Sequence, residues 1–260
     1  MKINIRLLIL WIPIILTSCS VPHYYYSSNI QNVPLFKEKY EFSGLIAGSF
    51  GEINNCLELQ TGYSLPDQVA LVANYMTGGN DHSTEHITDF CKIHYFEGAC
   101  GYYRPFEDFG VFEIYGGYGK GSENHAFTYS EYVNPFTWRT IQDGTADLSF
   151  SKLFIQPDVG IKLKWLEGAF SLRISNLNYT RINIYNTTYH LEELNNLKLN
   201  ITPWLFEPAI TCRMGLKPVK AQIQLVFTRN LTNSALLFEK FRINFGLYFN
   251  LQKTIKKNNN

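Results

Sequence analysis

The sequence predicts an all-β fold: a closed antiparallel transmembrane β-barrel of about ten strands, with short periplasmic turns and long extracellular loops. From about residue 40 to residue 251, apolar and polar residues alternate with the period of two that strands require. The connections between these stretches alternate between tight turns and long segments, as in outer-membrane barrels. Charged residues make up 17% of the chain, below the roughly 25% of soluble domains, and aromatic residues 15%. Together these features indicate a location and leave the activity open.

The first 18 residues have the pattern of a signal peptide. Lys2 and Arg6 precede an apolar run over residues 7–16, which is too short to span a hydrocarbon core of about 30 Å. The run ends in Leu-Thr-Ser-Cys at residues 16–19, which resembles a bacterial lipobox. We therefore expect Cys19 to carry a covalent N-terminal lipid. An ordinary cleavage site is the alternative, because small residues flank Cys19.

Residues 19–40 are predicted to form a lipidated periplasmic tether. The segment combines Pro22 and Pro34 with three consecutive tyrosines at residues 24–26, serines and asparagines. Tyrosines are favoured at membrane–water interfaces. A plain linker that packs against the rim of the barrel is the alternative.

The barrel is predicted to extend over residues 41–251. The last strand has the clearest alternation, with phenylalanine, isoleucine and leucine at odd positions from 241 to 251 and mainly polar residues between them. Pro157 and Pro208 are expected at bulges or strand ends, because proline cannot donate to a ladder. The predicted strands cover residues 41–50, 53–63, 68–75, 90–103, 110–118, 153–165, 169–180, 206–215, 219–228 and 241–251.

The connections define the two ends of the barrel. The short ones fall at residues 64–67, 104–108, 167–168 and 217–218, and the long ones at 77–88, 119–146, 181–201 and 229–240. With an even number of strands, both termini lie at the short-turn end, which is periplasmic. A lipid on Cys19 would then enter the inner leaflet of the outer membrane. Residues 252–260 form a basic, asparagine-rich tail at the same end.

Alternation alone also fits a soluble, lipocalin-like barrel with an apolar interior. The polar face is, however, rich in Gly, Asn, Gln, Ser and Thr, with charges spaced apart, which suits a crowded lumen better than a solvated wall. Opposite charges on a narrow circumference are expected to pair and fill the lumen. The residues predicted for this network are Glu58, Glu113, Asp158, Lys162, Lys164, Arg173, Glu207, Arg213 and Arg242.

Lys92 and His94 are expected to point into the lumen from the fourth strand. In the same register Glu97 would face lipid, at a cost of several kcal/mol, unless a bulge near Phe96 or a place at the membrane edge relieves it. The cluster Asp81-His82-Ser83 with Glu85 and His86 is interpreted as a solvated loop tip. A metal site or a hydrolytic Ser-His-Asp arrangement is the alternative for that cluster.

Four cysteines follow Cys19, and we expect them to be free, buried thiols. Cys91 and Cys100 share one strand and lie too far apart to pair, whereas Cys56 and Cys100 could meet only across a narrow lumen. Their spacing gives no support for a zinc site. The remaining cysteine, Cys212, has no neighbour in sequence with which to pair.

Four stretches resemble outer-membrane β-barrel lipoproteins of the Bacteroidetes, over roughly the first half of the chain. They are NVPLFKEK at residues 32–39, LELQTGY at 57–63, FEGACGYY at 96–103 and FEIYGGYG at 112–119. The resemblance implies the barrel fold. It implies no activity, substrate or catalytic residue.

The function predicted from these features is that of a non-enzymatic surface binding or envelope-structural protein with a largely side-chain-filled lumen. No catalytic, cofactor-binding or metal-ligating residue is predicted. A narrow pore for ions or small solutes and a lipid-modifying enzyme are the alternatives. The 23 basic and 22 acidic residues nearly balance, which argues against nucleic acid as a partner. The expected partners are outer-membrane lipids and an unidentified extracellular ligand.

Overall fold

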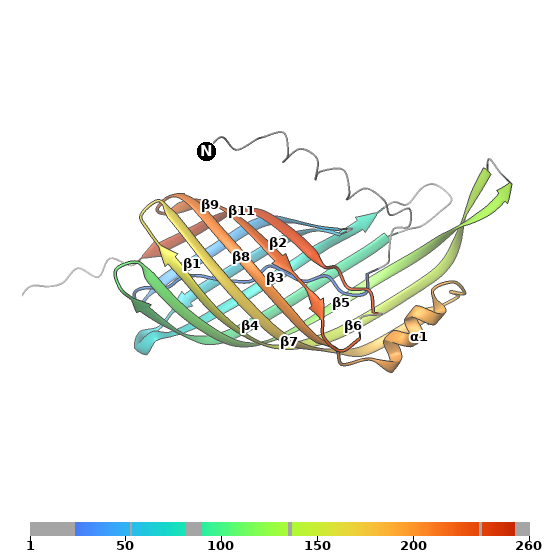
Figure 1. The fold of residues 1–260 in the computed structure, drawn as a ribbon, viewed down its shortest axis with the longest axis horizontal. Coiled ribbons are helices and arrows are strands. Elements are labelled where there is room, and N and C mark those ends of the chain that lie inside the picture. Colours follow the sequence, from blue (N-terminus) through green and yellow to red (C-terminus); the bar gives the residue numbers. More distant parts are fainter. Residues whose placement is uncertain (1–23, 53, 82–89, 135–136, 234–235, 253–260) are drawn as a thin grey trace, which may run out of the picture.

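Antiparallel strands, joined in the order of the sequence, make up most of the structure (Figure 1). The structure is a computed structural model that describes residues 24–52, 54–81, 90–134, 137–233 and 236–252. The signal peptide, Cys19, most of the cluster at 81–86 and the tail after residue 252 lie outside these residues. The elements are β1 (Glu41–Gly51), β2 (Asn55–Ser64), a 3-10 turn (Pro66–Gln68), β3 (Val69–Asp81), β4 (Phe90–Phe106), β5 (Gly110–Asn134), β6 (Thr137–Lys162), β7 (Leu166–Tyr185), α1 (Leu191–Leu199), β8 (Trp204–Leu216), β9 (Val219–Phe227), β10 (Arg229–Asn230) and β11 (Phe241–Gln252).

The sheet closes on itself, which confirms the predicted fold class. Each strand from β1 to β8 pairs with the next, β8 pairs with β9, β9 with β11, and β11 with β1. The two-residue β10 only adds a short ladder beside β8. Closure leaves no unpaired edge in the wall, which is the condition for a sheet that crosses a membrane.

The predicted difference between the two ends is also present. The turns after β2, β4, β6 and β8 are tight, and the start of β1 and the end of β11 lie at the same end. The opposite end carries a long β5–β6 hairpin and α1 (Figure 1). We call these the short-turn end and the long-loop end.

Two of the predicted loops contain regular structure instead. Residues 119–146 continue β5 and β6, and beyond the pair Ala126↔Thr145 these strands pair only with each other. Residues 181–201 contain the end of β7 and all of α1, whose Leu194 and Leu197 are buried. Outside the barrel wall a hairpin is solvated on both sides, so the apolar alternation that marks the other strands is weak there.

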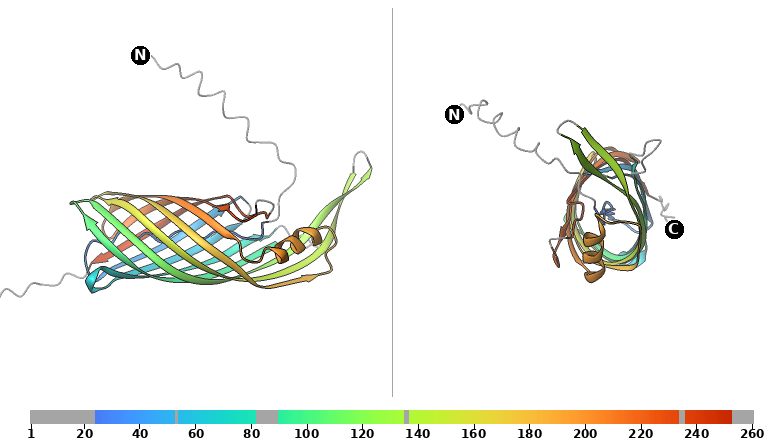
Figure 2. Two further views of the ribbon diagram at one scale, coloured as in Figure 1. Left: turned by 60° about the horizontal axis from the view of Figure 1, so that its bottom comes forward. Right: turned by 90° about the vertical axis from the view of Figure 1, so that its right-hand side faces the viewer.

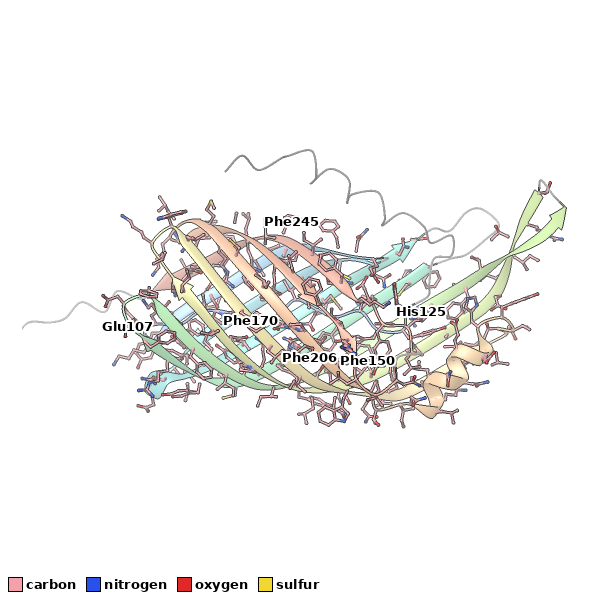
Figure 3. The ribbon with its side chains drawn as sticks, viewed as in Figure 1. Glu107, His125, Phe150, Phe170, Phe206 and Phe245 are labelled. Carbon is pink, nitrogen blue, oxygen red and sulfur yellow. The ribbon has the colours of Figure 1, made fainter. Side chains whose placement is uncertain are left out.

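The outer wall is apolar. Phe170 and Phe245 point away from the barrel and are 49% and 48% exposed, whereas Phe150 is buried inside the wall (Figure 3). Large aliphatic and aromatic side chains are exposed around the whole circumference, including Ile46, Leu71, Phe112, Leu153, Ile174, Ile210, Ile223 and Leu247. An apolar outward face of this extent is what a lipid-facing barrel surface requires. No described helix is long and apolar enough to cross a membrane.

Pro157 and Pro208 lie inside β6 and β8 without a register shift, and not at the expected bulges or strand ends. In the ladder between β6 and β7, pairing stops at Ile155 and resumes at Asp158, so that Pro157 needs no donor on that side. Pro208 is paired with β7, but the ladder between β8 and β9 begins only at Ala209. Each proline therefore lies where one of the two neighbouring strands needs no hydrogen bond from it, so its missing N–H group is not required on that side.

The expectation of a periplasmic tether is wrong for residues 24–36. These residues are buried, and they run as an extended segment through the inside of the barrel from the long-loop end to the short-turn end (Figure 2). The wall leaves room for them at two glycines. A Cβ at Gly62 would lie 3.1 Å from Phe36, and one at Gly160 would lie 2.8 Å from Leu35. We call residues 24–36 the plug segment.

The ladder beyond the wall generates a first prediction. Replacing residues 128–142 by a two-residue Asn-Gly turn should leave the barrel intact, because those residues pair only within the hairpin. The variant should keep the heat-dependent change in migration on a detergent gel that a closed barrel shows. Loss of this change would mean that the hairpin is needed for closure of the wall.

Candidate functional site

The lumen is the most highly organised polar region of the described chain, and the plug segment lies at its centre. An extended peptide has N–H and C=O groups on both sides, and these need partners when they are buried. The backbone of the wall is used in its own ladders, so side chains of the wall must supply those partners. The lumen carboxylates, amides and cations do so along the whole length of the plug segment.

Carboxylates of the wall accept the plug's N–H groups. The two oxygens of Glu113 accept from the backbone N–H groups of Leu35 and Phe36, at 3.0 and 2.8 Å. Glu58 accepts from the N–H of Ile30 at 2.9 Å. Each of these acids therefore binds plug backbone, and hydrogen bonds from N–H groups stabilise a buried carboxylate.

Cations and hydroxyls of the wall donate to the plug's carbonyl groups. The Lys162 ammonium reaches the Leu35 carbonyl at 2.7 Å, and the Arg213 guanidinium reaches the Val33 carbonyl at the same distance. The Tyr248 hydroxyl donates to the Pro34 carbonyl at 2.8 Å. The acids of the lumen thus accept from the plug's N–H groups, and the bases donate to its carbonyl groups.

At mid-lumen, one asparagine of the plug connects three charged side chains of the wall. The Asn29 amide donates to Glu97 at 2.8 Å, and its oxygen accepts from Lys152 at 2.8 Å and from Arg173 at 3.0 Å. Arg173 also pairs directly with Glu97, at 3.0 Å, and Lys152 lies 3.6 Å from the same carboxylate. All three charged side chains are almost completely buried.

The residues predicted for the charge network lie inside the barrel except one. Lys164 is exposed, because the chain has left β6 and turns toward β7 at that point. Glu207 accepts from the Tyr26 hydroxyl of the plug and from Ser175, and Arg242 pairs with Glu239. The buried members are Glu58, Glu113, Asp158, Lys162, Arg173, Glu207, Arg213 and Arg242. Most of them bind the plug or close neighbours, not an opposite charge across the lumen.

The prediction for the fourth strand is wrong in register. Lys92 and His94 are exposed on the outside, and Glu97 is buried in the lumen without any bulge in β4. The inward face of β4 carries Cys91 and Tyr95 together with Glu97. Near the long-loop end the lumen is lined by apolar and aromatic side chains, so polarity there no longer indicates the inward face.

Sequence reasoning also missed several partners of the network. Glu167 pairs with Arg213 at 3.2 Å and with Lys220 at 2.9 Å, and Glu41 pairs with Lys162 at 2.8 Å. Both acids lie at the start of a strand: Glu41 opens the strand that was expected there, whereas a turn was expected at Glu167. Each acid continues the period-two pattern of the inward-facing residues that follow it in its strand, and this pattern could have identified it.

The long-loop end of the lumen is closed by an apolar cluster. It contains Tyr25 and Tyr26 of the plug, side chains of the wall, the two buried leucines of α1, and Leu236 and Phe238 from the connection before β11. The plug is tied to that connection by backbone, since the Tyr25 N–H donates to the Leu237 carbonyl at 3.1 Å. The cluster therefore covers the polar lumen at this end.

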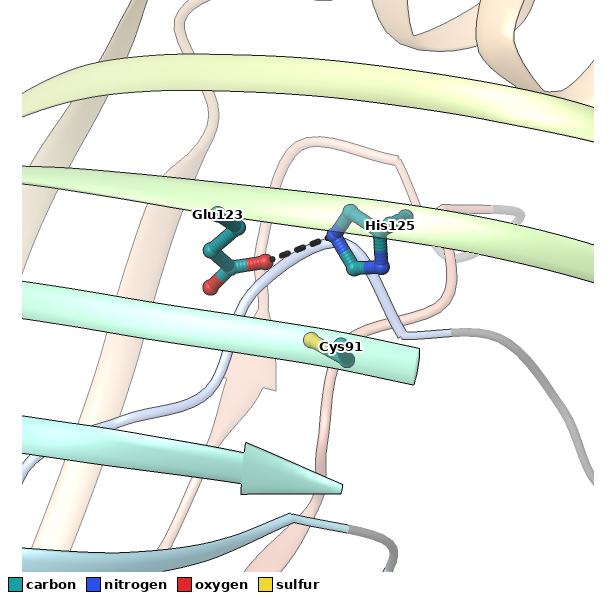
Figure 4. A group of neighbouring side chains, drawn as sticks. All are labelled: Cys91, Glu123 and His125. Carbon is teal, nitrogen blue, oxygen red and sulfur yellow. Dashed lines mark hydrogen bonds and ion pairs between the residues drawn. The ribbon is translucent and has the colours of Figure 1, made fainter. Parts of the chain in front are cut away.

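Next to this cluster lie three side chains with metal-binding chemistry. Cys91 on β4 and Glu123 and His125 on β5 are all buried, and their donor atoms lie within 4.8 Å of one another (Figure 4). The His125 ring nitrogen Nε2 is 3.2 Å from Glu123. The four cysteines in the described residues are free, as expected. Cys56 and Cys91 are buried, but the expectation of burial is wrong for Cys100 and Cys212, which are exposed.

Asp143, in the β6 part of the protruding hairpin, fixes the chain that leads into α1. Its carboxylate accepts from the backbone N–H groups of Thr188 and Tyr189 at 2.9 and 3.1 Å, and from the Thr187 hydroxyl. The His190 ring lies 2.7 Å from it. Burial would raise the pKa of Asp143, but these hydrogen bonds outweigh it and hold that pKa well below its usual range. The residue is therefore ionised at neutral pH and acts as an anchor for the loop.

Comparison with known proteins gives structural similarity at low TM-scores and no match in sequence. No protein-family model and no curated protein matches this chain. Solved outer-membrane barrels are similar in structure at very low identity. The KdgM porin is 10% identical over 81% of this chain and 99% of its own, with a TM-score of 0.38. LpxR from Salmonella typhimurium is 9% identical over 80% and 99%, with a TM-score of 0.38. The translocator domain of the autotransporter NalP from Neisseria meningitidis is 9% identical over 81% and 87%, with a TM-score of 0.39.

The mid-lumen contacts generate a second prediction. Arg173→Ala should lower the free energy of unfolding by about 3–5 kcal/mol, because it leaves the buried Glu97 carboxylate without its guanidinium partner. Lys164→Ala is the matched control. It removes a charge that lies exposed in a turn, and should change the free energy by less than about 0.5 kcal/mol. Denaturant unfolding in detergent measures both, and equal effects would contradict the assigned positions.

Proposed function

We propose that this chain is a non-enzymatic outer-membrane β-barrel lipoprotein, closed by its own N-terminal segment, that serves as a surface binding or envelope-structural protein. One observation carries the proposal: residues 24–36 are buried along the length of the lumen and hydrogen-bonded to the wall throughout. A barrel built for passage would not fill its lumen with a segment held by so many contacts.

The pore alternative would require the plug segment to move. Solutes would have to displace a peptide whose N–H and C=O groups are paired with buried charges, and leaving those charges unpaired is costly. They would also have to open the apolar cluster at the long-loop end. Both barriers favour a closed barrel over a channel.

The lipid-modifying alternative would require a nucleophile activated by a histidine on the lipid-facing wall. A hydroxyl–imidazole pair does lie on the outside, where Thr77 Oγ1 is 2.9 Å from His94 Nδ1. Within the described residues, no carboxylate is hydrogen-bonded to His94 to orient its ring, as the third member of a triad would. The pair alone does not favour an enzyme.

The direction of the plug supports a lipid on the extracellular side. At the long-loop end the Tyr25 hydroxyl donates to Glu193 of α1 at 2.8 Å. At the other end Phe36 packs against Tyr103, and Lys37 donates to the Asp108 carbonyl in the short β4–β5 turn. The chain thus enters the lumen at the long-loop end and leaves it at the short-turn end, directly before β1.

The position of Tyr24 limits where Cys19 can lie. Tyr24 follows Cys19 by five positions, and a fully extended chain of that length reaches at most about 18 Å. The hydrocarbon core alone is about 30 Å thick, so Cys19 cannot reach the periplasmic leaflet from the long-loop end. Long loops are extracellular in bacterial outer-membrane barrels. We therefore propose that a lipid on Cys19 lies in the outer leaflet, and not on the periplasmic side that the sequence led us to expect.

A third prediction tests the closed lumen by planar-bilayer recording. The unchanged protein should show no large, steady conductance. A variant in which residues 28–32 are replaced by a Gly-Ser segment of equal length should conduct, since it removes Asn29 and the other plug contacts at mid-lumen while keeping the chain connected. Steady conductance from the unchanged protein would overturn the proposal and favour the pore.

A fourth prediction tests the side of the lipid. An epitope inserted between Ser20 and Val21 should bind antibody on intact cells, because it precedes by only a few residues Tyr25, which lies at the long-loop end. The control is the same epitope after Asn260, which follows β11 at the short-turn end and should be reached only after permeabilisation. The reverse pattern would show that the acyl chains of Cys19 lie on the periplasmic side. Fatty-acid labelling, lost in Cys19→Ala, checks acylation independently.

A further inference from the structure

The long-loop end of the lumen brings together a thiol, a carboxylate and an imidazole from adjacent strands. Cys91 of β4 is paired directly with His125 of β5, so the two side chains share one face of the sheet. Glu123 precedes His125 by two residues and therefore points to the same side. We propose that Cys91, Glu123 and His125 form a binding site for one divalent transition-metal ion, with zinc as the ion that the donor set fits best.

The donor atoms suit zinc in type and in spacing. Zinc binds thiolate sulfur at about 2.3 Å, imidazole nitrogen at about 2.0–2.1 Å and carboxylate oxygen at about 2.0–2.2 Å, usually in a tetrahedral arrangement. Donors around one such ion lie about 3.2–3.8 Å from one another, by tetrahedral geometry at these bond lengths. The Glu123 Oε2 and His125 Nε2 atoms are already 3.2 Å apart, and all three donors lie within 4.8 Å. Small side-chain rotations therefore complete the arrangement.

The surroundings hold these donors in place. The Ser27 N–H of the plug donates to Glu123 Oε1 at 3.4 Å, which leaves Oε2 for the ion. The His125 ring stacks on Phe127 at 5.8 Å between ring centres, and the edge of Tyr25 meets it at 5.9 Å. Contacts of this kind orient metal ligands and tune their affinity. Three protein donors leave the fourth position of a tetrahedral site to water or to a small ligand.

The site is buried yet close to the surface. Cys91 also lines a pocket of about 340 Å³ whose other residues come from the ends of β3 and β4, including Gly78, Gly79 and Asp81. Glycine is required beside the cluster, since a Cβ at Gly79 would lie 1.7 Å from the Cys91 carbonyl oxygen. The pocket also includes the outward-facing Lys92 and His94, so it lies on the outer side of the wall, beside the backbone of Cys91.

The site also joins the plug to the wall. The ligands belong to the barrel, whereas Ser27 and Tyr25, which contact Glu123 and His125, belong to the plug segment. An ion bound only to the folded state raises stability in proportion to the logarithm of its concentration. We therefore infer that metal binding strengthens the closed state of the barrel at its outer end.

The test is a titration of the full-length protein, purified in detergent without a histidine tag and kept reduced. Co²⁺ should bind with a stoichiometry of one and produce a thiolate-to-cobalt charge-transfer band, which Zn²⁺ should displace. Cys91→Ser should abolish the band and weaken Zn²⁺ binding at least about tenfold, as loss of a metal contact does. Cys212→Ser, which removes an exposed thiol on the outer wall, should change neither.

Two further variants keep the outcome decisive. Glu123→Gln preserves size and should weaken Zn²⁺ binding while the barrel keeps its heat-dependent migration. His125→Ala should remove the rise in unfolding temperature that Zn²⁺ gives the unchanged protein. No stoichiometric binding of either ion to the folded protein, or binding that survives Cys91→Ser and Glu123→Gln, would overturn the site. Either result would leave the closed barrel untouched, because the conductance measurement tests that separately.

Discussion

The structure depends on one requirement: an extended peptide inside a membrane barrel must have its backbone hydrogen bonds satisfied away from bulk water. Every backbone group left unpaired in such a place costs free energy comparable to a lost hydrogen bond. The ladders of the closed wall use the backbone of the strands. Side chains of the lumen are therefore the partners that remain, and Gln224 shows the principle most plainly. It accepts from the N–H of Gln31 at 2.7 Å and donates to the carbonyl of the same residue at 2.9 Å, as a neighbouring strand would.

This requirement explains why the lumen contains charges of both signs. A peptide offers both donors and acceptors, so a wall that binds it needs acceptors for the N–H groups and donors for the carbonyls, and acids and bases can supply these. Glu113 and Lys162 fill these two roles at Leu35, one on its N–H and the other on its carbonyl. Ion pairs such as that of Arg213 with Glu167 neutralise the charge that the backbone leaves uncompensated. The presence of both charges in the lumen therefore follows from the donors and acceptors of the plug backbone. A water-filled channel would not need this balance of charges.

The amino-acid sequence was sufficient to predict the wall but not what fills it. Alternation placed the first strand at 41–50 and the structure has it at Glu41–Gly51, because one face meets lipid and the other a polar lumen. The plug segment has no such periodicity. It contacts wall on all sides, and a stretch of Tyr, Ser, Asn and Pro resembles a linker when its surroundings are unknown. The inward position of Glu97 could not be predicted for a related reason: its partner Asn29 belongs to the segment that was missed.

The same limit applies to Lys164 and to the cluster around Cys91. Lys164 lies two residues past the end of β6, where the rule that alternate residues face inward no longer holds, so it is not part of the network that its spacing suggested. In the proposed metal site, Cys91 is more than 30 positions away from Glu123 and His125, and only the Cys91↔His125 pairing between β4 and β5 brings it to them. A rule based on ligand spacing in short metal-binding motifs cannot identify ligands that strand pairing brings together across a long hairpin.

The direction of the plug segment also constrains how the barrel can form. The wall is completed by the ladder between β1 and β11, the first and last strands of the chain. If this ladder formed first, all the residues before residue 24 would have to pass through a lumen already narrowed by side chains. Ordering a long chain in this way costs conformational entropy. If the segment is already in place, β11 closes the wall around it, and the buried carboxylates meet backbone N–H groups as they leave water. The second order avoids any state in which Glu58 and Glu113 are buried without partners, so closure of the wall and seating of the plug belong to one step.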